Sequence, residues 1–285
     1  MSQKNNKHQQ SVKIPKSILI TAKILEMTSS KLAMKFASKL FMSPMKYAIP
    51  KREIDMDKNA MQERFILESG REIVIYQYGQ GEKKVLLVHG WSGRGTQLVK
   101  IADEMLKMGY STISFDAPGH GKASGKTSNM TEFIASILEM QEKFGPFEYA
   151  VGHSLGGMSI LNAIKRGLKV KKAVIVGSGD VVEDIMDDFI EKLGMNIAIS
   201  KKMKASFEKK IGETMDSYSA YIAAREVSIP VLIIHDNEDA DVPVSAAEHI
   251  HKNLKSSELL ITSGLGHRKI LGDAKVIKKI VSFLK

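Results

Sequence analysis

Short apolar runs recur along most of this 285-residue chain, and longer segments with the period of amphipathic helices separate them. Residues 85–88 are all Val or Leu, which is typical of a strand buried on both faces of a parallel sheet. Further strand patterns lie at 71–78, 112–115, 149–151, 173–176, 231–234 and 259–261, with helix-length segments at 98–108, 131–144 and 246–254. Strands that alternate with helices predict an α/β fold, in which helices cover both faces of a mostly parallel sheet.

One long segment interrupts this alternation. Residues 180–228 separate two strands that a single crossover helix would connect, and they show helical patterns without a strand pattern. We therefore predict a helical insertion there. The chain divides into an N-terminal basic amphipathic extension at 1–60 and an α/β domain at 61–285.

Charge and cysteine content exclude several classes of function. Of the formal net charge of +10, most lies in residues 1–60, which hold 12 Lys or Arg against 4 Asp or Glu. The basic character therefore belongs to the extension and does not indicate a nucleic-acid surface spread over the molecule. The chain has no cysteine, which excludes disulfides, a cysteine nucleophile and a cysteine-ligated metal.

The N-terminal extension contains a helical pattern. Residues 1–12 are polar and we expect them to be disordered, whereas 16–41 have apolar residues at four-residue spacing with lysines along the flank. Pro44 and Pro50 end the pattern. Three roles are open: docking on the rest of the chain, binding an anionic membrane surface, or contacting a partner or nucleic acid. We expect no nucleic-acid binding.

No apolar run approaches the roughly 20 residues that a membrane span requires. The first residues also lack the apolar stretch and small-residue cleavage site of a signal peptide. We therefore expect a cytoplasmic protein, which the membrane hypothesis would place at the inner membrane surface.

The segment 149–157, Tyr-Ala-Val-Gly-His-Ser-Leu-Gly-Gly, follows a strand pattern and opens a helix pattern. A serine nucleophile needs this strand–turn–helix context, because the sharp turn exposes its hydroxyl. Gly152 and Gly156 leave room where a Cβ would clash with neighbouring backbone. Ser154 would then stand at a helix N-terminus, where backbone N–H groups favour developing negative charge.

A serine hydroxyl needs a base, and a histidine base needs an orienting carboxylate. His267 follows the last strand pattern and is the candidate base. Residues 235–243, His-Asp-Asn-Glu-Asp-Ala-Asp-Val-Pro, follow the preceding strand and offer several carboxylates. The candidates for the acid are Asp236, Glu238, Asp239 and Asp241, with Asp180 as an alternative at the end of another strand.

Four motifs together resemble the α/β-hydrolase fold family from about residue 61 to the end of the chain. They are His89-Gly90-Trp91, the sequence Asp-Ala-Pro-Gly-His-Gly at 116–121, the Ser154 turn, and the pair Asp239 and His267. The resemblance is greatest to capped bacterial serine hydrolases, a group with serine aminopeptidase-like and lysophospholipase-like members. It implies an eight-stranded, mostly parallel sheet with a helical cap at about 180–228.

The same resemblance implies roles for single residues. Ser154 resembles the nucleophile, His267 the base, and Asp239 the acid, because Asp239 begins the Asp-x-x-Val-Pro pattern that ends at Pro243. The oxyanion hole would consist of the backbone N–H groups of Trp91 and Leu155. We expect His89 to hold the oxyanion loop, and we expect Asp116 and His120 to shape a turn.

These expectations describe an enzyme that transfers an acyl group to water without a metal or cofactor. An apolar face of the insertion at 181–193 would either line an acyl pocket or pack the cap on the sheet. We expect a small ester with a hydrophobic acyl chain, or a lysolipid-like ester, as substrate. The alternatives are a peptidase or amidase, a thioesterase, and a non-catalytic binding protein on the same scaffold. His249 and His251 point apart on a helix, so we expect no metal site there.

Overall fold

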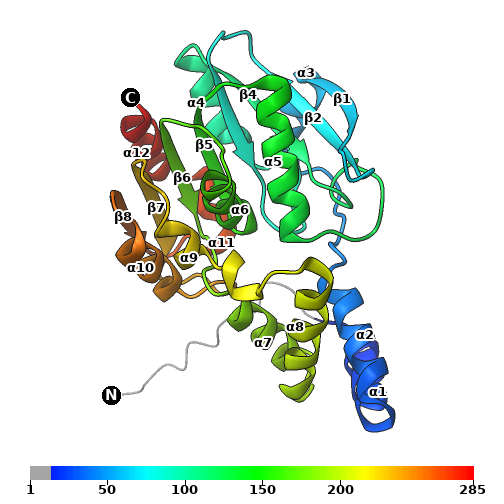
Figure 1. Ribbon diagram of the computed structural model, residues 1–285. Helices are drawn as coiled ribbons and strands as arrows, with labels where there is room; N and C mark the ends of the chain where they lie inside the picture. Colours follow the sequence, from blue (N-terminus) through cyan, green and yellow to red (C-terminus); the bar gives the residue numbers. More distant parts are fainter. Residues whose placement is uncertain (1–13) are drawn as a thin grey trace.

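An eight-stranded sheet forms the centre of the molecule in the computed structural model, which describes residues 14–285 (Figure 1). The polar tail at 1–12 lies outside the described residues. The strand order is β1-β2-β4-β3-β5-β6-β7-β8, and all pairs from β4 to β8 are parallel. The predicted α/β fold with a mostly parallel eight-stranded sheet is confirmed. The strands are β1 (Met61–Ile66), β2 (Glu72–Tyr78), β3 (Lys84–Val88), β4 (Ser111–Asp116), β5 (Phe147–His153), β6 (Lys172–Val176), β7 (Val231–Asp236) and β8 (Ser257–Thr262).

Strand β1 has no counterpart among the strand patterns of the sequence. It pairs antiparallel with β2, and β2 in turn pairs antiparallel with β4. None of the β1 residues is buried, because β1 is the edge strand of the sheet. An edge strand without a buried face gives no alternating apolar pattern, which is why the sequence did not reveal it.

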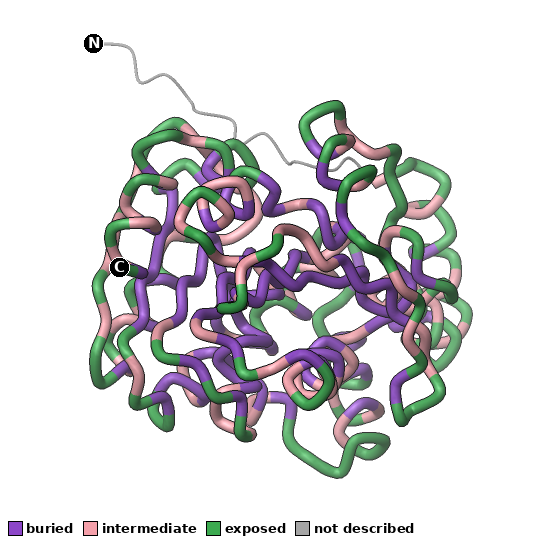
Figure 2. Tube along the Cα trace, turned by 90° about the horizontal axis from the view of Figure 1, so that it is seen from above, coloured by how far each residue is buried: buried purple, intermediate pink, exposed green. Residues whose placement is uncertain are grey.

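Helices cover both faces of the sheet. One face packs against α5 (Met130–Phe144), α6 (Leu155–Lys165) and α10 (Val244–Asn253), and the other packs against α4 (Val99–Lys107) and α12 (Ala274–Leu284). In β3 the side chains of Leu86 and Val88 enter the first core, and those of Val85 and Leu87 enter the second. Buried residues run along the central strands, and exposed residues lie on the outer helices and loops (Figure 2).

The segment 180–228 is helical. It contains α7 (Val182–Lys192), α8 (Ala198–Ile211), a short 3-10 helix at Met215–Tyr218, and α9 (Ala220–Ala224). Helices α7 and α8 lie beyond one end of the sheet (Figure 1). We call this segment the cap.

The N-terminal pattern at 16–41 is helical in the structure, but it is divided in two. The structure has two helices, α1 (Lys16–Thr28) and α2 (Ser30–Phe41), which pack side by side as a hairpin (Figure 1). Ser29 separates them in an extended conformation, with φ −160° and ψ 112°. Its hydroxyl oxygen accepts a hydrogen bond from the Leu32 amide, so Ser29 caps α2 and ends the continuity.

The hairpin packs on the cap. Phe41 of α2 makes an edge contact with Phe189 of α7 at 5.2 Å between ring centroids, and it stacks on Phe207 of α8 at 6.4 Å. The Asn196 amide between α7 and α8 donates to the carboxylate of Glu26. The chain then continues through a 3-10 turn at Lys51–Glu53 and α3 (Ile54–Asn59) to β1. Within residues 14–285, no helix is both long and apolar enough to cross a membrane.

Candidate functional site

The predicted site residues gather where the parallel strands of the sheet end. Ser154 follows β5 directly, Asp239 lies just beyond β7, and His267 lies just beyond β8 in the short helix α11 (Gly266–Lys269). Strands β5, β6, β7 and β8 are parallel neighbours, so their carboxyl ends meet at one edge of the sheet. Open α/β sheets bind their ligands at this edge, which we call the carboxyl edge.

Ser154 occupies a strained turn between β5 and α6. Its backbone has φ 53° and ψ −121°, and in residues 14–285 the only other non-glycine residue with positive φ is Ser92. A conformation of this kind costs on the order of 1–3 kcal/mol and persists only when the surroundings fix it. The Ser154 amide donates to the Val176 carbonyl at 2.9 Å, which ties the turn to the end of β6. Ser154 itself is half-buried, so its hydroxyl lies at the surface of the edge.

Two glycines make this turn possible. A Cβ added to Gly156 would lie 2.4 Å from the Val88 carbonyl oxygen, and one added to Gly152 would lie 2.7 Å from the backbone of Gly156. Real Cβ atoms do not approach backbone this closely, so any side chain here would push α6 away from β3 and β5. The Gly-x-Ser-x-Gly spacing therefore has the steric basis that the sequence suggested.

His267 and Asp239 form a direct pair. The distance between His267 Nδ1 and Asp239 Oδ2 is 2.7 Å, and both side chains are largely buried. An ionised carboxylate only accepts hydrogen bonds, so Nδ1 holds the proton and Nε2 is left as an acceptor. His267 thus has the tautomer that a general base requires.

Asp239 is held as an anion. Burial by itself would raise the pKa of Asp239, but the hydrogen bond from His267 and those from the amides of Val242 and Asp241 reverse this, and the net pKa is lowered. Both amides donate to Oδ1, at 2.9 Å and 2.8 Å, which leaves Oδ2 for the histidine. The carboxylate is therefore fixed in position as well as in charge.

The other candidate carboxylates have different partners. Asp236 accepts from the Thr262 hydroxyl and from the amides of Glu238 and Leu265, so it closes the loops that hold the site. Asp241 lies 3.8 Å from Arg268. Asp180 pairs with His249 and caps the start of α9 through the Tyr221 amide. Among these candidates the structure places Asp239 against the His267 ring.

Within residues 14–285 no hydrogen bond joins Ser154 to His267, but His267 packs on the residue that precedes the serine. The Ser154 hydroxyl makes no hydrogen bond to any described residue, whereas the ring of the preceding residue, His153, lies 4.6 Å from the His267 ring. Near this contact, a Cβ added to Gly177 would lie 3.3 Å from His267 Nδ1. Little space is thus left between Gly177 and the His267 ring. In free enzymes the serine–histidine bond is often long and shortens only when substrate binds.

His153 is a contributor that the sequence analysis did not identify. Its Nε2 lies 2.8 Å from the His267 carbonyl oxygen, so Nε2 must donate the hydrogen bond. Full burial, followed by repulsion from His267, lowers the pKa of His153 to about 3. His153 is therefore neutral and fixes the backbone of His267. Its role depends on a contact 114 residues away in the sequence, for which no local signal exists.

The residues proposed for an oxyanion hole lie in two segments that adjoin Ser154. Leu155 opens α6, and Trp91 lies in the loop after β3; neither amide donates a hydrogen bond within residues 14–285. A Cβ on Gly90 would lie 2.9 Å from the Ser154 Cβ, so the Trp91 loop passes directly beside the serine. Two unpaired amides next to a serine hydroxyl are suited to stabilise negative charge on an oxygen.

His89 holds this loop in place. The Ala117 amide donates to His89 Nε2 at 3.1 Å, so the ring proton is on Nδ1 and is donated to the Gly90 carbonyl at 2.7 Å. Complete burial keeps the pKa of His89 well below its usual value. His89 therefore joins the loops after β3 and β4 as a neutral structural group.

Asp116 and His120 shape the neighbouring turn. Asp116 is buried and accepts hydrogen bonds from the Tyr76 hydroxyl and from the amides of Gly95 and Lys122. Burial lowers the pKa of His120 to about 4, and its ring packs edge-on against Trp91 at 5.1 Å. These contacts position the Trp91 side chain beside the site.

The apolar face of α7 is used mainly for packing. Three of its residues, Val182, Met186 and Ile190, are buried in the core shared with α2 and α8, as is Leu193, which follows the helix. Ile185 stays 37% exposed, and its Cδ1 would lie 3.0 Å from a Cβ on Gly179, in the loop after β6. Ile185 is thus an exposed apolar residue at the start of α7, next to the loop after β6.

The histidine and carboxylate groups fit proton transfer better than metal binding. Within residues 14–285, the donor atoms of Asp239, Asp241 and His267 lie within 4.8 Å of one another. However, His267 Nδ1 is protonated and already bonded to Asp239, so a metal would have to displace that hydrogen bond. His249 and His251 have separate partners, Asp180 and Ser257.

Known proteins share this fold and sequence pattern. A model described as alpha/beta hydrolase family matches residues 85–208, and one described as TAP-like protein matches residues 213–285. A non-heme haloperoxidase from Rhodococcus erythropolis is 23% identical over 267 residues, with 76% of this chain and 97% of that protein covered.

Two further proteins are similar. A 2-hydroxy-6-oxononadienedioate/2-hydroxy-6-oxononatrienedioate hydrolase from Escherichia coli is 31% identical over 124 residues, which cover 39% of this chain and 42% of that protein. The structure of an esterase from Exiguobacterium antarcticum has a TM-score of 0.61 at 17% identity, with 79% of this chain and 99% of that chain covered.

Proposed function

The chain belongs to the α/β-hydrolase family, and from this premise we propose that it is a serine hydrolase that cleaves carboxylic esters through an acyl-enzyme on Ser154. The observation that best supports this proposal is the conjunction of a strained serine turn with the buried His267–Asp239 pair at the same edge. A binding protein would not require a histidine whose tautomer is fixed by an ionised carboxylate.

In the proposed reaction the Ser154 oxygen attacks the ester carbonyl carbon. His267 Nε2 takes the hydroxyl proton, and the resulting imidazolium is stabilised by Asp239. The amides of Leu155 and Trp91 donate to the oxyanion, each contributing roughly 3 kcal/mol. The proton then passes from Nε2 to the leaving alcohol, and the carbonyl re-forms as the acyl-enzyme.

Water completes the cycle. It donates a proton to His267 Nε2 and attacks the acyl carbon, and the Ser154 oxygen leaves with that proton. Ser154 and His267 return to their starting states, and the carboxylic acid is released. The proposed reaction requires only these side chains and backbone amides, and we propose that it proceeds without a metal or cofactor.

Apolar groups at the site favour a hydrophobic acyl chain. Leu155 and Trp91 are half-buried next to Ser154, and Ile185 is exposed at the start of the cap. An ester is favoured over a peptide because amides are harder to cleave, and because two carboxylates of the site, Asp236 and Asp239, are occupied by hydrogen-bond donors. We therefore propose a small or lysolipid-like ester as the substrate.

The test combines covalent labelling with turnover. Wild type should react with a fluorophosphonate and hydrolyse p-nitrophenyl esters, and Ser154→Ala should lose both. Ser159→Ala is a matched control, since Ser159 lies in the same helix and donates to the Leu155 carbonyl. It should retain both activities, and the chain-length optimum with wild type measures the acyl pocket.

The outcomes separate the alternatives. Labelling without ester turnover would support a thioesterase or an amidase on the same nucleophile, which thioester and peptide substrates would then distinguish. Wild type that neither labels nor turns over any of these substrates would contradict a catalytic role and would support a binding protein on this scaffold.

A further inference from the structure

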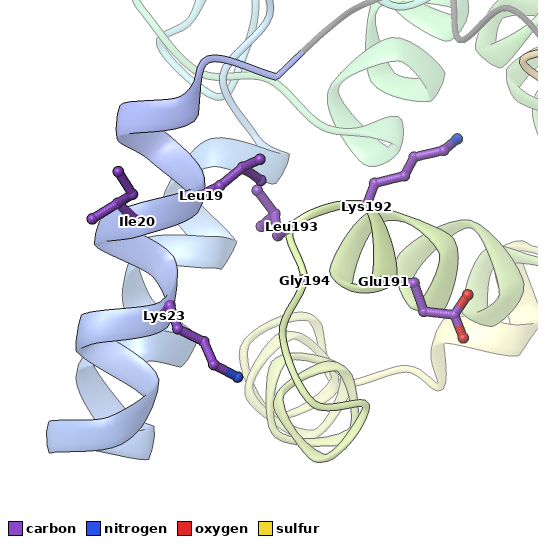
Figure 3. Close-up of a pocket in the computed structure, with 7 residues that line it drawn as sticks. All are labelled: Leu19, Ile20, Lys23, Glu191, Lys192, Leu193 and Gly194. Carbon is purple, nitrogen blue, oxygen red and sulfur yellow. The ribbon is translucent and has the colours of Figure 1, made fainter.

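Helix α1 presents a row of apolar side chains to solvent. Ile20, Ile24 and Met27 are spaced by four and three residues, so they share one face, and they are 60%, 56% and 80% exposed. We call these three residues the α1 stripe. The opposite face of α1 is the one that packs, with Ala22 completely buried. In Figure 3, Leu19 points toward Leu193 of the cap, whereas Ile20 points away from it.

A groove extends this apolar surface toward the cap. It has a volume of about 380 Å³ and lies between α1 and the end of α7. Leu19, Ile20 and Leu193 supply apolar walls, while the charged residues Lys23, Lys192 and Glu191 also line the groove (Figure 3). Single exposed apolar residues are ordinary on soluble proteins, but a contiguous row beside an apolar groove marks an interaction surface.

Lysines are exposed on both helices of the hairpin. Lys16 and Lys23 are exposed on α1 itself. On α2, the exposed residues Lys31, Lys35 and Lys39 follow at four-residue spacing, and we call these the lysine row. Leu32, which is 51% exposed, lies next to the lysine row. The two helices thus present an apolar and a strongly basic exposed surface.

The hairpin itself carries few acidic groups. Residues 14–50 contain six lysines and one acidic residue, Glu26. The Glu26 carboxylate is occupied by the Asn196 amide and by Lys23 at 3.3 Å, and this amide lowers the pKa of Glu26. On α8, Lys201 and Lys202 are also exposed, and Lys202 donates to Ser30. Exposed lysines therefore lie on both hairpin helices and on α8 of the cap, whereas α7 of the cap carries mostly acidic charge.

We propose that this face of α1 and α2 binds the surface of membranes that contain anionic phospholipids. An amphipathic helix binds such a surface by burying apolar side chains at the headgroup boundary while its lysines contact lipid phosphates. The combination of an apolar row with flanking lysines fits this partner, since a nucleic acid would not require the row and an acidic protein would not require so much apolar exposure.

The hairpin also connects to the candidate site. Phe41 packs on both cap helices, and the linker after α2 passes the Trp91 loop, where the Met45 amide donates to the Ser92 hydroxyl at 3.0 Å. Binding through α1 and α2 would therefore hold the cap and the carboxyl edge near the lipid. The proposal concerns binding and goes beyond the proposed hydrolysis, so it is tested without turnover.

The experiment uses the full chain with Ser154→Ala, so that no lipid is cleaved. The protein is sedimented with vesicles of phosphatidylcholine alone and with vesicles of equal parts phosphatidylcholine and phosphatidylglycerol. Two variants change the surface: Ile20→Gln with Ile24→Gln and Met27→Gln, and Lys31→Gln with Lys35→Gln and Lys39→Gln. Their matched controls replace equally exposed groups elsewhere, Met61→Gln with Ile66→Gln on β1, and Lys275→Gln with Lys278→Gln near the C-terminus.

We expect the parent to bind the anionic vesicles at least about tenfold more tightly than the neutral ones, and to release them in high salt. Each surface variant should weaken this binding by at least about tenfold, and the controls should bind like the parent. Unchanged thermal midpoints would show that the surface variants are folded. Equal binding to both vesicles, no binding by the parent, or surface variants that bind like their controls would each overturn the proposal.

Two other partners of this surface would be recognised by further measurements on the same variants. If the stripe joins two copies of the chain, analytical ultracentrifugation will show a dimer that the Gln variants of the stripe dissociate, with no vesicle binding. If the lysines bind nucleic acid, a DNA duplex will bind in a manner that depends on the lysine row and not on the stripe. Either result without vesicle binding contradicts the membrane proposal.

Discussion

The carboxyl edge and the N-terminal hairpin place their side chains according to opposite rules. At the edge, Asp239, His267 and His153 are largely buried and have specific partners; Asp239, for example, accepts three hydrogen bonds. On the hairpin, the largest apolar groups of α1 lie in solvent and its lysines have few partners. The edge is therefore sensitive to the loss of one atom, whereas the exposed face of the hairpin tolerates substitution unless a partner covers it.

The contrast reflects different tasks. A site for proton transfer must hold its groups within a fraction of an ångström, so neighbouring side chains and amides fix each one. A surface that meets a lipid boundary needs only the right composition on one face. Substitutions that remove a single contact at the edge should thus have the largest effects in the molecule.

The largest effect is expected for Asp239→Asn. An amide at this position would accept the hydrogen bond from His267 Nδ1 less well and would stabilise the other tautomer of the ring, with the proton on Nε2. We therefore expect kcat to fall by about 10³- to 10⁴-fold. The measurement is steady-state hydrolysis of the best p-nitrophenyl ester. Asp180→Asn is the control, because the Asp180 carboxylate pairs with His249 and not with His267. This substitution should change kcat by less than about threefold. If Asp180→Asn loses more activity than Asp239→Asn, then Asp180 is the acid that orients the base and the assignment of Asp239 is wrong.

A smaller loss is expected when the support of His267 is removed. His153→Phe keeps an aromatic ring but loses the donor to the His267 carbonyl. A shift of the base by about an ångström should lower kcat by about 10- to 100-fold, while KM stays nearly constant. His153→Gln retains a donor and should recover part of the rate. If KM and kcat change together, or if Gln behaves like Phe, His153 contributes to binding or folding and not to positioning.

The Ser154 turn could be read from the sequence because its signals are local. The strand that precedes Ser154, the two glycines and the start of α6 are adjacent in the chain, so the turn follows from one short segment. The choice among Asp236, Asp239 and Asp241 rested on a resemblance, since only the folded loop shows which oxygen faces His267. The contact of His153 with His267 has no local signal at all.

The N-terminal hairpin and its contacts with the cap were harder to predict. Spacing alone could not show that Ser29 would adopt an extended conformation and divide the helix, although its hydroxyl is a typical N-cap. The apolar face of α7 gave the same pattern whether it bound a ligand or packed on α2 and α8. Periodicity identifies a buried face but does not identify what covers it.

Buried neutral histidines predict a specific loss of stability in acid. Burial lowers the pKa of His120 to about 4, compared with about 6.5 in the unfolded chain. Between these values only the unfolded state binds the proton, so the free energy of unfolding should fall as pH decreases, by up to about 1.4 kcal/mol per pH unit for this group. The loss is complete once the pH is below the folded-state value.

The test is urea unfolding of wild type and His120→Phe at about pH 7 and about pH 5. Phe preserves the ring packing on Trp91 and removes the titrating group. The variant should lose about 2 kcal/mol less than wild type between the two conditions, whatever its stability at neutral pH. Equal losses in both proteins would mean that His120 is protonated in the native state or that other groups cause the acid sensitivity.

The smallest expected effect is the loss of a helix cap, and it tests whether the hairpin unfolds together with the sheet. Ser29 and Asn129 cap α2 and α5 in the same way, each accepting from the amide three residues ahead. Loss of either cap should cost about 1 kcal/mol of helix stability, or about fivefold in an opening equilibrium. Because α5 lies in the central core and α1 and α2 pack at the periphery, the same cost should appear in different measurements.

Asn129→Ala should lower the global free energy of unfolding by about 1 kcal/mol in urea titration. Ser29→Ala should leave that value nearly unchanged and should raise amide hydrogen exchange about fivefold within residues 16–41. If Ser29→Ala lowers the global value as much as Asn129→Ala does, the hairpin unfolds together with the sheet. The contacts of Phe41 with the cap would then make α1 and α2 part of the same cooperative unit as the carboxyl edge.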